Sequence, residues 1–274
     1  MVSTPALSAW NARYGDTAPP PASVNPILEH LLQHCSVRAY DAKREVSDDV
    51  LFQAVAAGQS ASTSSNLQVW SVIAVRDQAK RDRFAELAGG QKHISQAPLF
   101  LAWVLDLSRL RRIGQTVDSP TSGTDYLELY TVGAVDVALA AQNAVTALES
   151  MGLGIVYIGG MRNHPEEVAK ELGLPQGCMV LFGMCVGYPD PAVPADIKPR
   201  LPQSSVLHME QYGTTSEADD VSGYDARIVA YQVQQGRSDT PWSRTATKRV
   251  RGPESLTGRH RLREALENLG IEAR

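Results

Sequence analysis

The spacing of apolar residues divides most of the chain into helices and strands. Apolar or β-branched runs predict strands over residues 69–75, 99–105, 155–158 and 179–186. Helices and strands mix without a strict βαβ rhythm, so the sequence predicts an α+β fold with a central sheet rather than a doubly wound fold. The predicted helices cover residues 26–34, 46–58, 78–87 and 125–151, a segment that begins at 163–167, and residues near 224–234 and 258–269.

Residues with known preferences for helix ends mark several of these boundaries. Ser47 and the two acidic residues after it are typical of a helix start. Gly89 and Gly90 predict the C-terminal cap of the helix before them. The strand over residues 99–105 is apolar on both faces, as expected in the middle of a sheet.

The most apolar helical segment runs from about residue 131 to residue 151 and is rich in Ala and Val. Its length is that of a membrane span, but a span of about 20 residues carries few or no polar groups. We therefore expect a helix buried on most of its faces, which needs a large core or a partner subunit. The polar residues that interrupt the segment are Asp136, Gln142, Asn143, Thr146 and Glu149.

Length and composition limit the domain organisation. The 274 residues are 43% hydrophobic and 20% charged, which is enough for one large domain or two small ones. Residues 1–24 end in a proline run and are expected to form an arm before the folded unit. Residues 25–274 are expected to form a single domain, in which about 190–274 make a C-terminal helical excursion.

Charge and cysteine usage exclude several classes of protein. A net charge of −4 leaves no overall basic field to attract nucleic acid or anionic lipid. Cys35, Cys178 and Cys185 are odd in number and form no CxxC pair, which argues against a disulfide framework and a zinc site. The N-terminus has no basic segment leading into an apolar core, so we expect no signal peptide. These features indicate a cytoplasmic protein without a membrane or nucleic-acid partner.

Five short clusters offer candidate chemistry. His-Cys-Ser-Val-Arg at 34–38 gathers groups suited to anion oxygens, and the two cations of Lys-Pro-Arg-Leu-Pro at 198–202 can point the same way on an extended backbone. The hydroxyl-rich segment 60–68 suits the edge of a heteroaromatic ring. Gly-Gly-Gln-Lys-His occupies 89–93, and the glycines of 152–163 suggest backbone packed against something flat. Taken singly, segment 34–38 also fits a solvated helix end, and segment 60–68 a polar linker. Segment 89–93 also fits a helix stop followed by a new helix start.

The motifs that the chain lacks also restrict the chemistry. The glycines do not form the GxGxxG fingerprint, and there is no GxxxxGK[ST], GxSxG or HExxH. No carboxylate pair, metal set or nucleophile–base arrangement is recognisable. Anion-binding cations and small-residue loops without acid–base machinery suit a cofactor that supplies its own reactivity.

The order and separation of the clusters resemble the nitroreductase family, in the branch of the major oxygen-insensitive nitroreductase and the flavin reductase of luminous bacteria. The resemblance runs from about Pro26 to the C-terminus. It implies a nitroreductase-like FMN-binding domain, with a central, mainly antiparallel sheet flanked by helices, in an intertwined homodimer with two FMN sites at the subunit interface. The motifs are His-x-Ser-x-Arg, Gly-Gly-Gln-Lys-His, Gly-Leu-Gly-x-Val-Tyr-Ile-Gly-Gly-x-Arg-Asn and Lys-Pro-Arg-Leu-Pro.

The resemblance also implies a reaction. An FMN-dependent NAD(P)H oxidoreductase of this kind reduces nitroaromatics, quinones or flavins in ping-pong turnover. The reduced nicotinamide, NADPH and possibly NADH, leaves hydride on flavin N5 and departs, and the electron acceptor takes its place. FMN carries this chemistry, so the resemblance implies no catalytic side chain and no metal.

Matching positions give the expected contacts with FMN. Cys35 stands where some relatives have Arg, which removes one phosphate contact. The resemblance implies that the phosphate and ribityl chain are contacted by His34, Ser36, Arg38, Lys198 and Arg200. It implies hydrogen bonds to the isoalloxazine ring or ribityl chain from Ser64, Ser65 and Gln91. The residues expected to line the ring are Tyr157, Ile158, Gly159 and Gly160.

Two arginines are expected to contact the substrates. Arg259 resembles the basic residue that reaches over the flavin to the acceptor. A tail Arg-Gly, whose Arg grips the adenosine 2′-phosphate in relatives, appears here as Gln235-Gly236, with Arg237 close by. Discrimination of NADPH from NADH requires cations at that phosphate, so we expect Arg237 to supply a shallower preference for NADPH.

Two other functions fit the same residues. A flavin carrier or redox sensor would keep the FMN contacts without turnover. A dedicated flavin reductase would use FMN as a second substrate and supply reduced FMN to a monooxygenase.

Overall fold

The computed structural model describes residues 3–274, which divide into two compact units. The first unit joins the chain up to Cys35 with Asp196–Leu256. The second comprises Ser36–Ala195 and Thr257–Arg274. The residues predicted as a single domain, 25–274, contribute to both units.

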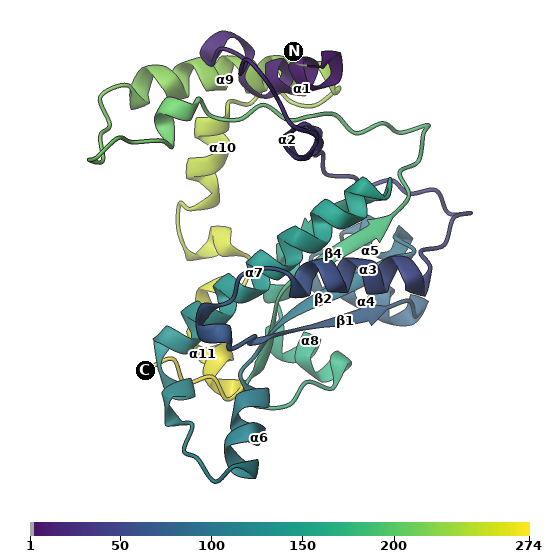
Figure 1. Cartoon of the computed structure of the whole chain (residues 1–274), viewed down its shortest axis with the longest axis vertical. Coiled ribbons are helices and arrows are strands. Elements are labelled where there is room, and N and C mark those ends of the chain that lie inside the picture. The colour runs from purple at the N-terminus through teal and green to yellow at the C-terminus, as the bar shows by residue number, and fades with distance from the viewer. Residues whose placement is uncertain (1–2) are drawn as a thin grey trace. The chain divides into compact units, whose positions relative to one another are not determined.

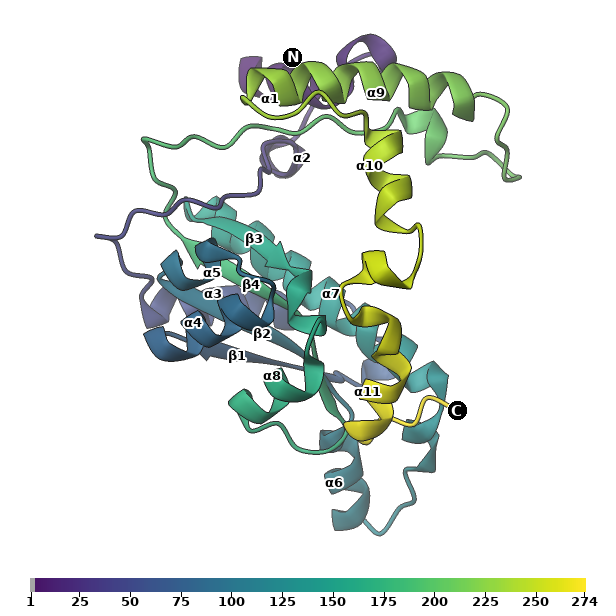
Figure 2. The ribbon, with the colours of Figure 1, turned by 180° about the vertical axis from the view of Figure 1, so that it is seen from behind.

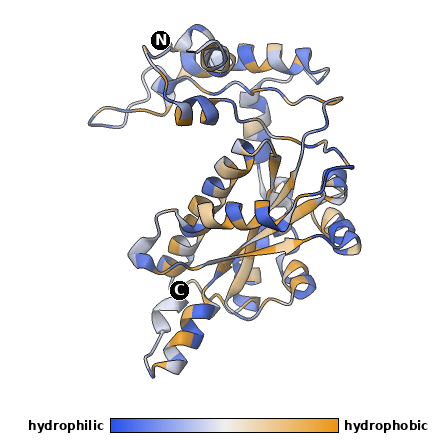
Figure 3. Cartoon of the chain, turned by 45° about the vertical axis from the view of Figure 1, so that its right-hand side comes forward, coloured by the Kyte–Doolittle hydropathy of each residue, from blue (hydrophilic) through white to orange (hydrophobic). Residues whose placement is uncertain are grey.

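A four-stranded sheet forms the centre of the second unit (Figure 1). Its strands lie in the order β1-β2-β4-β3, and every neighbouring pair is antiparallel. This confirms the predicted α+β fold with a mainly antiparallel sheet. Apolar residues follow the strands closely (Figure 3). The strands are β1 (Trp70–Val75), β2 (Leu99–Asp106), β3 (Gly154–Ile158) and β4 (Cys178–Gly187).

Helices cover both faces of this sheet. Side chains alternate across a strand, so Leu101 and Trp103 of β2 belong to one hydrophobic cluster with α7. Phe100 points the other way, and its ring centroid lies 5.3 Å from that of Phe84 in α4. The helices of this unit are α3 (Asp48–Gln59), α4 (Gln78–Leu87), α5 (Lys92–Gln96), α6 (Ser108–Thr116), α7 (Leu127–Ser150), α8 (Pro165–Leu172) and α11 (Leu262–Asn268).

The long helix α7 is a core helix along one face. Gly133 lies so close to β2 that an added Cβ would be 2.8 Å from Cγ of Leu105. Its opposite face leaves Val135 51% and Leu139 42% exposed, so in a single chain the helix is less buried than its sequence predicts. Among residues 3–274, it is the one helix whose length and composition would allow a membrane crossing. Core helices of soluble proteins can have the same length and composition.

The first unit is helical and has a small core of its own. Trp10 of α1 and Leu32 of α2 are buried together, with Tyr14 and Ile197 packed against them. The indole Nε1 of Trp10 donates a hydrogen bond of 2.9 Å to the carbonyl oxygen of Ala18. Figure 2 shows the same ribbon from behind. The helices of this unit are α1 (Thr4–Tyr14), α2 (Pro26–Leu32), α9 (Glu217–Gln234) and α10 (Trp242–Arg249).

Several boundaries differ from those that the sequence predicts. All four strands are confirmed to within one residue or two, and the Ser47 side chain caps α3 as predicted. Helices α1, α5, α6 and α10 were not among the predicted helices, and α1 lies within the segment expected to be an arm. α9 begins earlier than predicted, and α11 begins later because a 3-10 turn, Arg259–Arg261, precedes it. The apolar periodicity of α1 is weak, whereas α6 and α10 are amphipathic but contain few apolar residues.

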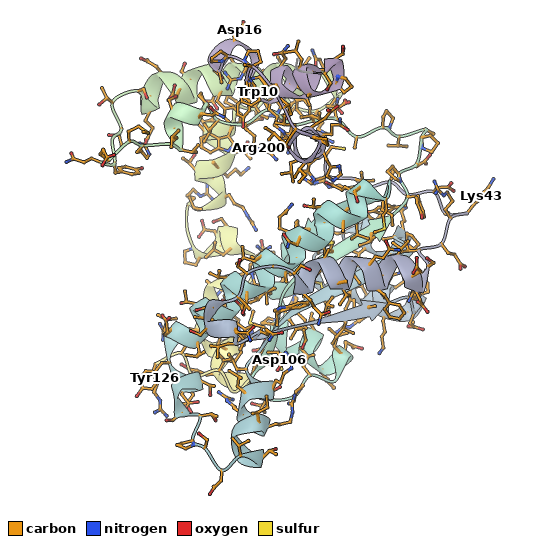
Figure 4. All side chains as sticks on the ribbon, viewed as in Figure 1. Trp10, Asp16, Lys43, Asp106, Tyr126 and Arg200 are labelled. Atoms are coloured by element: carbon orange, nitrogen blue, oxygen red, sulfur yellow. The ribbon has the colours of Figure 1, made fainter. Side chains whose placement is uncertain are left out.

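Asp106, at the end of β2, is buried and joins three strands to α6 (Figure 4). Its carboxylate accepts hydrogen bonds from Ser71 (2.7 Å), Ser108 (2.6 Å), the Cys178 thiol (3.2 Å) and the Arg109 backbone N–H (3.2 Å). Burial raises the pKa of Asp106, but the hydrogen bonds outweigh burial and hold the pKa at about 2, below its usual 3.8. Burial raises the pKa of Cys178 to about 11. The ionised carboxylate is therefore the form that stabilises this corner of the fold.

We predict that Asp106→Asn lowers the free energy of unfolding by about 2 kcal/mol at pH 7. Because the folded-state pKa lies below the ordinary value, the ionised group stabilises the fold above about pH 4 and loses this effect as pH falls toward 2. Urea unfolding at pH 7, 5 and 3 measures it, with exposed Asp239→Asn as the control. If Asp106→Asn lowered the free energy of unfolding by the same amount at all three pH values, this account would be wrong.

Candidate flavin site

The segment that follows Cys35 runs beside the third strand of the sheet. Ser36 forms a parallel bridge with Ile155, and the Val37 N–H donates a hydrogen bond of 2.8 Å to the Ile155 carbonyl oxygen. This approach requires a glycine at 154, because an added Cβ there would lie 2.4 Å from Val37 Cγ2. Val37 is buried, while Ser36 and Arg38 are exposed. The two predicted phosphate-binding side chains of this unit therefore share one side of an extended segment.

A turn of two glycines ends β3 and packs against the loop after α4. An added Cβ at Gly160 would lie 2.7 Å from both the Ala88 carbonyl oxygen and Nε2 of Gln91. Gln91 Nε2 also donates a hydrogen bond of 2.8 Å to that carbonyl oxygen. The structure thus brings together the Gln91 and Gly160 positions expected to contact the flavin, and only glycine fits at 160.

Arg259 lies at the same turn. Its Nε donates a hydrogen bond of 2.9 Å to Oδ1 of the buried Asn163. Its Nη1 lies 3.8 Å from the position of an added Cβ at Gly159. Arg259 is therefore held beside the glycine turn by Asn163, a residue within the predicted motif to which the sequence assigned no role.

The hydroxyl-rich loop before β1 is held by one buried carboxylate. Asp136 of α7 is 2% exposed and accepts hydrogen bonds from Thr63 Oγ1 (2.6 Å), the Ser64 N–H (3.3 Å) and the Val69 N–H (3.2 Å). Within this loop Ser65 has φ of 49°, a left-handed conformation that is uncommon outside glycine. Asp136 therefore fixes the loop that exposes Ser64 and Ser65, whereas the sequence marked it only as a polar interruption of an apolar helix.

Two ring side chains complete the description of this unit. Tyr157 is partly exposed, and its hydroxyl donates a hydrogen bond of 3.4 Å to Gln142 Oε1 on α7. Burial raises the pKa of Tyr157. His93 has a buried Nε2 without a hydrogen-bond partner among residues 3–274. Burial, and then the charge of Arg38, lower the pKa of His93, so the His93 ring is neutral at pH 7.

The other predicted residues, His34, Cys35, Lys198, Arg200 and Arg237, belong to the first unit. Lys198 and Arg200 are exposed on either side of the buried Pro199, as expected for two cations on one side of an extended segment. The Pro199 carbonyl oxygen accepts a hydrogen bond of 3.2 Å from the Tyr224 hydroxyl, which fixes the backbone between them. Arg237 is exposed beyond the end of α9.

The sequence matches the Nitroreductase family over residues 31–188 and the Nitroreductase family, C-terminal domain, over residues 198–274. The chain belongs to the nitroreductase family. This confirms the family that the clusters predicted. The family glycines and the Lys-Pro-Arg-Leu-Pro segment fall inside the matched ranges, whereas α1 lies before them.

Curated relatives and solved structures extend the family match over most of the chain. It is 39% identical over 231 residues to the NADPH-flavin oxidoreductase of Vibrio harveyi, covering 84% of this chain and 92% of the relative. It is 40% identical over 223 residues to the oxygen-insensitive NADPH nitroreductase of Salmonella typhimurium, covering 80% and 89%. The structure of B. megaterium NfrA2 superposes with a TM-score of 0.85 and 35% identity, covering 92% of this chain and 100% of that one.

Proposed function

We propose that this nitroreductase-family protein is an FMN-dependent NAD(P)H oxidoreductase that reduces nitroaromatics, quinones or flavins. The observation that carries the proposal is the Gly159–Gly160 turn, packed against Gln91 and flanked by Arg259. The names of the relatives, which include an FMN reductase [NAD(P)H] of Bacillus subtilis that is 36% identical, support the predicted cofactor and reaction. FMN, when bound, supplies the acceptance and delivery of hydride.

The side chains fit this cofactor. A flavin phosphate needs hydrogen-bond donors and positive charge, which exposed Ser36 and Arg38 offer on one side of their segment. The buried Nε2 of His93, which has no hydrogen-bond partner among residues 3–274, offers a further polar contact. We assign the phosphate and ribityl chain to His34, Ser36, Arg38, Lys198 and Arg200, with Cys35 between them. We assign the ring system to Ser64, Ser65, Gln91, Tyr157, Ile158, Gly159 and Gly160.

We also propose that the protein is a homodimer in the cytoplasm. The exposed apolar side chains Val135 and Leu139 on α7, with Phe52 (68% exposed) on α3, are suited to burial against a second copy. The three cysteines are thiols in this structure, as in a reducing compartment. A net charge of −4 provides no overall basic field to attract nucleic acid.

The purified protein should be a yellow dimer with about one FMN per chain. NADPH should bleach the flavin absorbance, and a quinone should restore it. Absorbance spectra, released-flavin content and sedimentation measure these properties. Colourless protein that takes up no FMN would end the proposal. Bound FMN that NADPH cannot bleach would favour the carrier or sensor, and saturable turnover of added FMN would favour the dedicated flavin reductase.

Arg38→Ala should weaken FMN binding by about 10- to 150-fold, because a hydrogen bond to a charged group contributes about 1.5–3 kcal/mol. Riboflavin lacks the phosphate and should bind wild type and variant alike. Fluorescence titration with the two flavins measures both affinities. An equal loss for riboflavin would show that Arg38 acts on the fold and not on the phosphate.

Arg259 and Arg237 should act on substrates and not on flavin retention. We expect Arg259→Ala to lower kcat/KM for NADPH or the acceptor about tenfold or more with FMN content unchanged.

Arg237→Ala should lower only the ratio of kcat/KM for NADPH over NADH. Arg263→Ala, an exposed arginine of α11, is the control. If Arg259→Ala had the same kinetic constants as this control, Arg259 would have no role in substrate binding.

A further inference from the structure

We propose that the N-terminal helix α1 is a positioning element for the phosphate end of the flavin site, acting through Arg13. The inference rests on the proposed function, since it concerns the same cofactor. α1 precedes both family-matched ranges, so it is an addition of this chain to the matched regions. Its contacts reach the two segments of the first unit that carry predicted phosphate-binding residues.

The first of these segments is the end of α2. Arg13 is only 6% exposed, and its Nε donates a hydrogen bond of 3.1 Å to the Leu32 carbonyl oxygen. Its Nη2 donates a hydrogen bond of 2.8 Å to the carbonyl oxygen of His34. Carbonyl groups at a helix C-terminus lack partners within the helix and attract cations. The guanidinium therefore fixes the backbone of His34 itself, one residue before Cys35.

The second segment is Lys198–Arg200. The Arg200 N–H donates a hydrogen bond of 2.9 Å to the Arg13 carbonyl oxygen. Arg13 thus bonds to the His34 segment through its side chain and to the Arg200 segment through its backbone. The apolar packing repeats this connection. Trp10 of α1 is buried with Leu32, and the partly buried Ile197 packs against them; Leu32 and Ile197 lie close in sequence to His34 and Lys198. Trp10 and Arg200 are labelled in Figure 4.

Joining two segments through a buried guanidinium has a high desolvation cost in free energy. Burial of a charge is unfavourable unless it is hydrogen-bonded, and an apolar contact would stabilise the unit as well or better. The positive charge of Arg13 also contacts the His34 carbonyl oxygen, and the Arg13 backbone contacts Arg200, two residues after Lys198. A positive charge placed there favours binding of a phosphate dianion. Positioning of these groups, together with the added field, explains why the helix buries an arginine here.

The test compares FMN with riboflavin in the full-length protein. Arg13→Gln should weaken FMN binding about tenfold and change riboflavin binding less than twofold, so the affinity ratio of FMN to riboflavin falls. Arg13→Lys, which keeps the charge but has one donor nitrogen atom in place of three, should give an intermediate ratio. Asn11→Ala, an exposed change on the same helix, should leave the ratio at the wild-type value.

The outcomes separate the inference from the proposed function. Wild type that binds FMN no better than riboflavin, or neither flavin, overturns both. If wild type binds FMN more tightly than riboflavin but Arg13→Gln keeps the full affinity ratio, or loses affinity for both flavins equally, only the positioning role is overturned. If Arg13→Gln does not fold, the ratio of Arg13→Lys decides: a reduced ratio supports the inference, and an unchanged one overturns it.

Discussion

The sheet of the second unit depends on two central strands that are apolar on both faces. β2 is buried along its whole length, and β4 is nearly so, which means that neither face can meet water. Helices must therefore cover the sheet from two sides, and polar groups are displaced to the ends of strands and to loops. Several of the candidate flavin residues lie in those places: Gly159 and Gly160 after β3, Ser64 and Ser65 before β1, and Gln91 in the loop that follows α4.

Within this frame the candidate site is built mainly from backbone. Gly154 lets the Ser36–Arg38 segment approach β3, and Gly160 lets the turn after β3 meet the loop of Gln91. Side chains act largely as supports: Asp136 holds the hydroxyl-rich loop, and Asn163 holds Arg259. A flat ring is suited to such a surface, since glycine backbone can approach it without side chains between.

Sequence patterns located the strands, the capped helix α3 and the glycine turn, because each leaves a local signal in residue type and spacing. They could not assign Asp136 or Asn163, whose partners lie 67 and 96 residues away in the chain. Helix α1 was missed for a related reason. Its buried residues, Ala6, Ala9, Trp10 and Arg13, include a small residue pair and a cation, which are weak signs of a helix with a core. Arg13 gains its meaning only from carbonyl groups 19 and 21 residues further on.

The burial of two thiols has a consequence for their reactivity toward electrophiles, a class that includes the quinones proposed as acceptors. Burial raises the pKa of Cys178 to about 11 and that of Cys185 to about 12. At pH 7 a thiol with a pKa of about 11 is ionised in about one molecule in ten thousand. Since the thiolate is the nucleophile, both sulfur atoms are protected from alkylation by chemistry as well as by access. Cys35, which is only partly buried, is the most accessible of the three thiols.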